Sequence, residues 1–132
     1  MRIAVCMKAV PSTTEVRMDP KTHTIVRDGK QSVANPFDTA ALEVALRLKD
    51  RLGATVSVLS MGIPDTQRIL RDAISRGADE ALLLSDRAFA GADTLATSYA
   101  LSLGLAQLGP CDLVICGKMA VDGDTAQIGP EL

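Results

Sequence analysis

The sequence predicts an α/β fold in which a doubly wound, mostly parallel sheet carries helices on both faces. Short apolar runs alternate along the chain with longer segments of helical periodicity, an order that implies parallel strands joined by right-handed crossovers. The apolar runs are nearly continuous, as is typical of strands that helices cover on both sides. A chain of 132 residues fits one compact domain of this kind.

Seven elements are expected in order along the chain. The pattern predicts strands at 3–7, 55–60, 80–84 and 113–116, and helices at 35–52, 64–76 and 93–108. Asn35 and Pro36 provide an N-cap and a first-turn proline for the first helix, and Gly53 ends it. The helix positions expected to face the core are Ala41, Ala45, Leu48, Leu52, Ile69, Leu70, Ala73, Ile74, Leu101, Leu105 and Leu108.

The connection between the first strand and the first helix is unusually long. Residues 15–18 and 24–27 alternate polar and apolar side chains around a turn-forming stretch at 19–23. We therefore expect a small hairpin insertion at about 12–30, within a single domain that spans 1–132.

Composition argues against several classes of function. A net charge of -2, from 14 basic and 16 acidic residues, gives no basic surface for nucleic acid. No apolar run approaches the roughly 20 residues that span a bilayer, and the first residues do not form a signal peptide, so we expect a cytoplasmic protein without membrane insertion. The single histidine, His23, and three scattered cysteines offer neither a zinc site nor a Ser-His-Asp triad. We therefore expect no metal site and no catalytic acid, base or nucleophile.

Polar, glycine-containing loops follow three of the predicted strands. They contain Gly62, Gly91 and the pair Gly117 and Gly123. The carboxyl ends of parallel strands share one edge of the sheet, where such folds bind ligands. Glycine lets the main chain approach a ligand, and a helix N-terminus offers unpaired N–H groups to a phosphate. The sequence therefore predicts an adenine-nucleotide-binding, Rossmann-like domain, although it has neither a G-x-G-x-x-G fingerprint nor a P-loop.

Two segments each place an acidic residue and a hydroxyl at an expected helix start, Asp93-Thr94 and Asp124-Thr125. Because a carboxylate repels phosphate, the aspartates either cap backbone N–H groups or accept hydrogen bonds from ribose hydroxyls. The threonines and backbone amides are then left for phosphates. The last helix is expected to begin close to the final residue, so the sequence looks like a fragment.

Three stretches carry a family resemblance: 33–38 (VANPFD), 86–97 (DRAFAGADTLAT) and 117–130 (GKMAVDGDTAQIGP). They resemble the β subunit of electron transfer flavoprotein, and the likeness extends over essentially the whole chain. In that family an α and a β subunit form a heterodimer that carries electrons from NADH or acyl-CoA-type dehydrogenases to an acceptor. The α subunit holds most of an FAD, and the β subunit holds a second nucleotide.

The second nucleotide is AMP in ordinary members of the family and a second FAD in electron-bifurcating members. The segment 86–97 is similar to the bifurcating type, so the resemblance implies FAD, with AMP as the alternative. It also implies an electron-carrier subunit rather than an independent enzyme, because a flavin's reactivity belongs to the cofactor.

Site residues follow from the resemblance, position by position. The adenine and ribose would lie against Cys6, Asn35, Phe37 and Asp38, with Met61 nearby. The phosphates would be bound by Gly91, Asp93, Thr94, Thr97, Asp122, Gly123, Asp124, Thr125, Ala126, Gln127 and Gly129. Simpler roles stay open: a helix cap for Asn35, core filling for Phe37 and strand-end packing for Met61. Lys8 is expected to end its strand in solvent.

Two other functions stay open. A stand-alone ATP- or AMP-binding module similar to universal stress proteins would share this type of fold, but its phosphate loop ending in Gly-Ser is missing. An adenylating or ATP-pyrophosphatase enzyme would have a serine-glycine loop after the first strand, where residues 9–12 read Ala-Val-Pro-Ser.

Overall fold

The computed structural model of the protein describes residues 1–12, 20–23 and 32–132. Its central sheet has four parallel strands in the order β5-β4-β1-β6. The strands are β1 (Arg2–Cys6), β4 (Thr55–Met61), β5 (Glu80–Leu84) and β6 (Leu113–Cys116). All four were predicted from their apolar runs, and the parallel pairing is confirmed.

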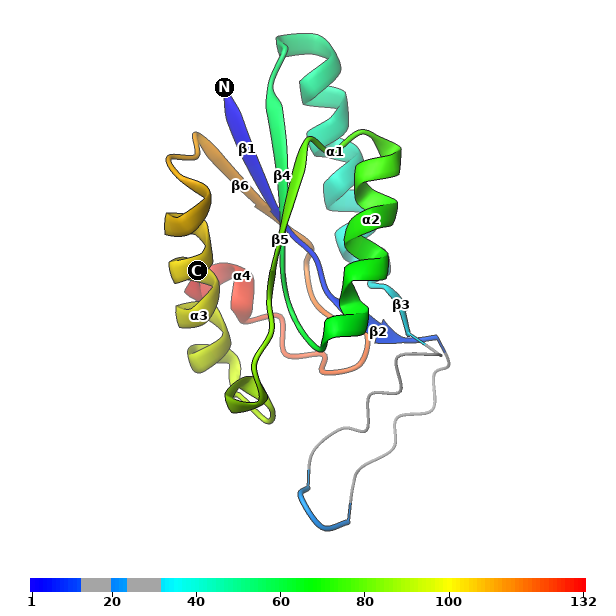
Figure 1. Ribbon diagram of the computed structural model, residues 1–132, viewed down its shortest axis with the longest axis vertical. Coiled ribbons are helices and arrows are strands. Elements are labelled where there is room, and N and C mark those ends of the chain that lie inside the picture. The colour runs from blue at the N-terminus through cyan, green and yellow to red at the C-terminus, as the bar shows by residue number, and fades with distance from the viewer. Residues whose placement is uncertain (13–19, 24–31) are drawn as a thin grey trace.

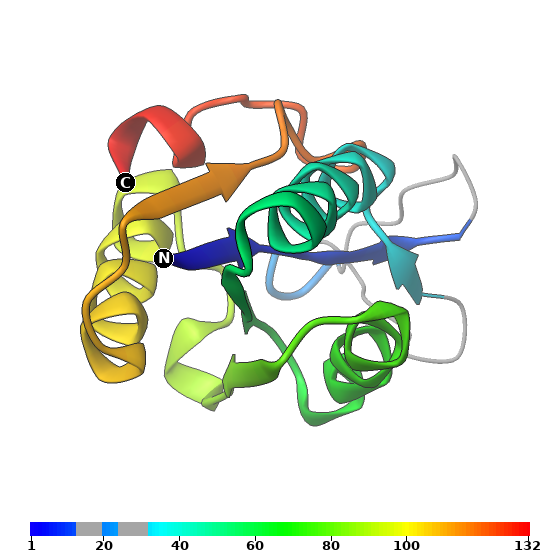
Figure 2. The ribbon, with the colours of Figure 1, turned by 90° about the horizontal axis from the view of Figure 1, so that it is seen from above.

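Helices lie on both faces of this sheet, as Figures 1 and 2 show. One face is covered by α1 (Pro36–Leu52) and α2 (Gln67–Arg76), the second of which follows a 3-10 turn, η2 (Pro64–Thr66). The opposite face carries α3 (Thr94–Leu108) and α4 (Ile128–Glu131). A further 3-10 turn, η3 (Arg87–Phe89), precedes α3. The predicted doubly wound α/β fold is therefore confirmed.

The strand order reverses between β1 and β6. From β1 the chain moves outward through α1 to β4 and through α2 to β5, and α3 then crosses the other face and returns the chain to β6 on the far side of β1. In doubly wound sheets, ligands bind beyond the carboxyl ends of the two strands that flank such a reversal. The strand order therefore points to the region beyond the ends of β1 and β6 as the place for a ligand, and we call this region the crevice.

The core consists of two apolar layers, one on each face of the sheet. The larger layer packs β1 and β4 against α1 and α2, and the smaller one packs Cys6 and Leu59 against Leu101 of α3. Two expected core positions are wrong, because Leu52 is 59% exposed and Ile74 is 40% exposed. Leu52 is the last residue of α1, and Ile74 points about 100° around α2 from the buried Ala73.

The long connection after β1 begins and ends with two short antiparallel strands, β2 (Ala9–Pro11) and β3 (Ser32–Ala34). Three residues are too few to give a periodic signal, so these strands were not predicted. Most of the predicted hairpin at about 12–30 lies outside the described residues. Among the described residues, no helix combines the length and the apolar character needed to cross a bilayer.

Candidate functional site

The carboxyl ends of β1 and β6 lie side by side, because Cys6 pairs in register with Cys116. The start of α1 joins them, since the backbone N–H of Asn35 donates to the carbonyl oxygen of Lys8 at 2.8 Å. Residues from three distant parts of the sequence thereby meet at the crevice. Four of the predicted site residues are in this group: Cys6, Asn35, Asp38 and Asp122.

The side chain of Asn35 connects α1 to the loop that follows β6. It is 1% exposed, its Nδ2 donates to the carbonyl oxygen of Met119 at 2.8 Å, and its Oδ1 accepts from the N–H of Val121 at 3.2 Å. Asn35 occupies the N-cap position of α1, yet its side chain makes no capping hydrogen bond. The helix-cap role considered for this side chain is therefore wrong, and its amide instead positions the loop.

Lys8 also holds this loop. Its Nζ lies 2.7 Å from Oδ1 of Asp122, whose side chain is only 1% exposed, and the same oxygen accepts from the N–H of Gly123 at 2.8 Å. The expectation that Lys8 simply ends its strand in solvent is wrong, because the end of β1 faces the β6 loop.

Across residues 1–12, 20–23 and 32–132, no three His, Cys, Asp or Glu side chains are grouped as a metal site.

Asp38 is buried in the first turn of α1, behind the crevice. Burial raises the pKa of its carboxyl from 3.8 to about 6, although hydrogen bonds from the Asn35 side chain and the Lys8 backbone act in the opposite direction. The Lys8 N–H donates to its Oδ2 at 2.9 Å. Asp38 can therefore exchange a proton close to neutral pH, which is unusual for an aspartate.

Gly117 is the residue that lets the β6 loop pass close to α1. A Cβ at this position would stand 2.8 Å from the carbonyl carbon of Phe37 and 2.9 Å from the backbone nitrogen of Asp38. These are backbone atoms that cannot rotate away, so a side chain here would push the loop and the helix apart. Gly123, six residues further on, has open space around the same position.

A second group of predicted residues lies at the first turn of α3. The Oδ1 of Asp93 accepts from the N–H of Ala96 at 2.8 Å, so the capping role that was open for Asp93 is confirmed. The hydroxyl of Thr94 donates to Oε1 of Glu131 at 3.3 Å, which brings the start of α3 next to the end of α4. The turn before α3 follows β5, and the loop before α4 follows β6. Because β5 and β6 are parallel, both segments leave the sheet at its carboxyl edge.

The segment before α4 differs from the prediction. The helix begins at Ile128 with Gln127 as its N-cap, so Asp124 and Thr125 do not stand at a helix start. The chain from Asp124 to Ala126 is irregular, because Asp124 and Ala126 have left-handed φ angles of 55° and 56°. Left-handed conformations are uncommon for an alanine, and such strain is concentrated at functional sites.

The remaining predicted residues occupy less informative positions. Phe37 is 36% exposed, so the core-filling role considered for it is wrong. Met61 packs against the Cys6–Leu59–Leu101 layer, in agreement with a strand-end packing role. Gly91, with a φ of 73°, Thr125 and Gln127 are exposed, and Gly129 packs against the Cβ of Cys116.

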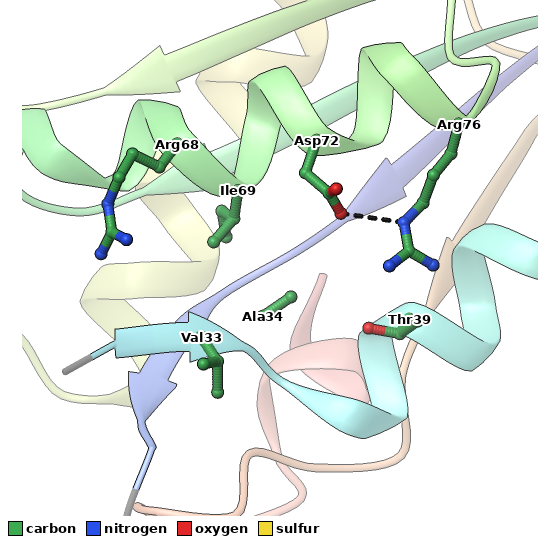
Figure 3. Close-up of a pocket in the computed structure, with 7 residues that line it drawn as sticks. All are labelled: Val33, Ala34, Thr39, Arg68, Ile69, Asp72 and Arg76. Carbon is green, nitrogen blue, oxygen red and sulfur yellow. Dashed lines mark hydrogen bonds and ion pairs between the residues drawn. The ribbon is translucent and has the colours of Figure 1, made fainter.

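A depression of about 380 Å³ lies elsewhere, between β3, the start of α1 and one side of α2 (Figure 3). Asp72 accepts from Arg76 of the same helix at 2.8 Å, and Arg68 lies toward the other end of α2. The middle of a helix offers no unpaired N–H groups to an anion, and none of the predicted site residues lines this depression. We therefore assign the candidate site to the crevice at β1 and β6.

Several residues that build the crevice were not among the predicted set. They are Lys8, Met119, Val121 and, at the α3 turn, Glu131. Lys8 could have been found from the strand order, because it lies two residues beyond the end of β1, which borders the reversal. The two backbone partners of Asn35 had no signal in the sequence, since any residue type can supply a main-chain group.

Comparison with known proteins gives consistent matches along the chain. The electron transfer flavoprotein domain family matches residues 22–132. The chain is 54% identical to the electron transfer flavoprotein subunit beta of Clostridium acetobutylicum, which it covers over 51% of that protein's length and 100% of its own. It is 53% identical to the caffeyl-CoA reductase-Etf complex subunit CarD of Acetobacterium woodii, with coverages of 51% and 100%.

A third relative, the protein FixA of Azotobacter vinelandii, is 52% identical over 98% of the chain and 47% of the relative. The chain spans about half the length of the curated relatives that it matches. The resemblance to electron transfer flavoprotein β subunits that the sequence motifs indicated is thereby confirmed.

Proposed function

The chain belongs to the electron transfer flavoprotein family, and we propose that it is the nucleotide-binding part of a β-type subunit. In this proposal the subunit pairs with an α subunit in the cytoplasm and carries electrons from a dehydrogenase to an acceptor. The names of the relatives support the assignment, since two of them are subunits of electron transfer flavoprotein or Etf complexes. The chain supplies no acid, base or nucleophile in this role. A flavin would supply the redox chemistry, and the protein would bind and orient it.

The nucleotide is proposed to lie beyond the carboxyl ends of β1 and β6. The observation that carries this proposal is the buried Asn35 amide, which fixes the backbone of the 117–123 loop at the reversal of strand order. The exposed ring of Phe37 offers a surface for adenine, and the buried Asp38 behind it holds the backbone of Lys8 in place. The strained turn at 124–126 would present backbone amides to phosphate.

We propose FAD of the bifurcating type, rather than AMP, as this nucleotide. Candidate residues occur in two groups, one at the crevice and one at the first turn of α3. There the Thr97 hydroxyl can donate to a phosphate oxygen, and Thr94 can do so by exchanging its hydrogen bond to Glu131 for one to the ligand. AMP carries a single phosphate next to its ribose and would use only the first group. The longer FAD, with its pyrophosphate and ring system, can extend from one group to the other.

The partner is proposed to be an α subunit, and the outer side of α3 is consistent with a protein partner. Helix α3 has no charged side chain along its 15 residues. Leu95, Tyr99 and Leu103 follow one another at helical spacing and are 67%, 66% and 56% exposed. An apolar surface of this kind is typical of protein interfaces.

The proposal is tested by identifying the nucleotides released from the full-length subunit co-purified with its α partner. We expect two equivalents of FAD per heterodimer, and a Thr94→Val/Thr97→Val variant is expected to lose one of them. Thr55→Val, at the amino end of β4, is the matched control and keeps both. One FAD with stoichiometric AMP would reject the bifurcating version. ATP would indicate the stand-alone module, and the absence of any adenine compound would reject nucleotide binding.

A further inference from the structure

Two cysteines face each other across the strands that border the crevice. Cys6 ends β1, Cys116 ends β6, and the two residues pair in register. Both pack into the same layer with Leu59 and Leu101, so their side chains project from the same face of the sheet. Neighbouring strands stand about 4.8 Å apart, and cysteines joined by a disulfide have Cα atoms about 4.4–6.8 Å apart.

The two thiols also interact directly. A hydrogen bond between them raises the pKa of Cys6 far above its ordinary value, with burial as the next cause, and it lowers the pKa of Cys116. The negative charge of Asp38 acts against ionisation of both thiols. Cys116 is also the more exposed of the two, since Cys6 is 9% exposed and Cys116 is only partly buried. Cys116 is therefore the sulfur that ionises first and meets a reagent first.

We propose that Cys6 and Cys116 form a reversible thiol-disulfide pair that reacts with low-molecular-weight disulfides. The Cys116 thiolate attacks one sulfur of the small disulfide, whose S–S bond breaks, and one small thiolate leaves and takes up a proton. The Cys6 thiol then loses its proton and attacks the sulfur of Cys116, which expels the second small thiol. The protein loses two hydrogens and two electrons, and the small disulfide is reduced to two thiols.

The geometry favours a labile bond over a permanent one. Side chains on in-register parallel neighbours project in the same direction, so their Cβ atoms stand about as far apart as the strands, roughly 4.8 Å. A relaxed disulfide needs a Cβ separation of about 3.8 Å, so β1 and β6 must move together before the bond can close. Strained disulfides are easily reduced, which is the behaviour of regulatory pairs.

Helix α4 covers one side of Cys116 and so limits the directions from which a reagent can reach it. Gly129 packs directly on this cysteine, since a Cβ added to Gly129 would stand 3.4 Å from the Cβ of Cys116. Ile128 of this four-residue helix and the following Leu132 pack against the Cys6–Leu59–Leu101 layer. Cys111, the third cysteine, precedes β6 at the opposite edge of the sheet, where its sulfur contacts the carbonyl oxygen of Gly109. Cys111 therefore serves as an internal control for the reactivity of a cysteine outside the pair.

The test is to treat the full-length protein with oxidised glutathione, quench with acid, alkylate the remaining thiols and map the peptides by mass spectrometry. We expect Cys6 and Cys116 to lose alkylation together, to appear as one linked peptide pair lacking two hydrogens, and to recover after dithiothreitol. Cys6→Ser is expected to accumulate glutathione on Cys116, because the resolving thiol is missing. Cys116→Ser is expected to leave Cys6 reduced, and Cys111→Ser is expected to behave as the unmodified protein does.

Two results would overturn the proposal. One is full alkylation of Cys6 and Cys116 under conditions that modify Cys111. The other is a glutathione adduct on Cys116 that persists when Cys6 is present. Both can be read from the unmodified protein alone, so the outcome does not depend on whether the buried-site variants fold. Neither depends on which nucleotide the protein binds.

Discussion

The ammonium group of Lys8 lies 2.7 Å from Oδ1 of Asp122, a carboxylate whose side chain is 1% exposed. The pair joins the residue beyond β1 to the loop beyond β6, and these residues are 114 positions apart in the sequence. Because water is largely excluded from the carboxylate, the pair resembles a buried ion pair more than a surface one. Removing either partner takes a charge-assisted hydrogen bond away from the other.

Lys8→Met is therefore expected to lower the free energy of unfolding by about 1.5–3 kcal/mol, because the buried Asp122 carboxylate loses a charge-assisted hydrogen bond. Adding Asp122→Asn to this variant should restore part of the loss, because the remaining amide is neutral. Denaturant unfolding of the single and double variants measures both effects. Arg47→Met, which breaks an exposed pair with Glu43, is the control, with an expected cost of at most about 0.5 kcal/mol. Equal losses for Lys8→Met and Arg47→Met would contradict the prediction.

Gly117→Ala is expected to separate the β6 loop from α1. The added methyl would meet the backbone of Phe37 and Asp38 at less than 3 Å, and overpacking of this kind costs about 1–3 kcal/mol. Gly123→Ala is the matched control, because nothing lies within 4 Å of its added methyl. Thermal unfolding compares the two variants, and a melting temperature for Gly117→Ala as high as that for Gly123→Ala would show that the loop can move freely.

Asn35→Ala removes both hydrogen bonds between α1 and the loop and leaves the Met119 carbonyl and the Val121 N–H without their partner. Unsatisfied buried groups cost about 1–3 kcal/mol each, reduced where water can enter. We expect lower stability together with faster amide hydrogen exchange at Val121. Thr39→Ala, whose hydroxyl makes only a 3.4 Å contact with the Asn35 carbonyl, should leave exchange at Val121 unchanged. Unchanged exchange in Asn35→Ala would mean that another contact holds the loop.

Asp38 is expected to make stability depend on pH in a direction opposite to that of most aspartates. Its folded-state pKa of about 6 lies above the unfolded value of 3.8, so the folded state binds the proton more tightly. This contribution to the free energy of unfolding is complete below pH 3.8 and is lost as pH rises to 6. At about 1.4 kcal/mol per pKa unit, the loss amounts to about 3 kcal/mol.

The measurement is the difference in unfolding free energy between Asp38→Asn and the unmodified protein, followed from pH 4 to pH 7. The difference should grow in favour of Asp38→Asn as pH rises. Parallel profiles for Asp38→Asn and the unmodified protein would show that the aspartate is solvated when ionised.

The fold was largely predictable because each element had a strong local signal. The continuous apolar runs of β1 and β4 and the helix boundary residues Asn35, Gly53 and Asp93 mark elements that the structure confirms. The short strands β2 and β3 were missed because pairing with a distant partner, rather than local pattern, creates them. Leu52 and Ile74 were wrongly expected in the core. Helical periodicity identifies the side of a helix that faces the sheet, but it does not tell how far the sheet extends along and around that side.

The candidate site was predictable in its location and less so in its interactions. The rule that ligands bind at a reversal of strand order points to the residues after β1 and β6. It does not tell that the Asn35 side chain binds the loop after β6, or that Lys8 reaches Asp122. Those contacts depend on how two loops pack, which is a property of the assembled fold.

The order of the strands also determines at what stage of folding the crevice at β1 and β6 can form. Strands β1, β4 and β5 and their helices can assemble from contiguous sequence. The hydrogen bond between Asn35 and Val121 can form only later, because Val121 lies 86 residues further along the chain. Contacts of such large sequence separation form slowly because a long loop must close first. On the ribosome, the chain would hold most of its sheet before the crevice exists, and a ligand could stabilise the protein only after the last strand has docked.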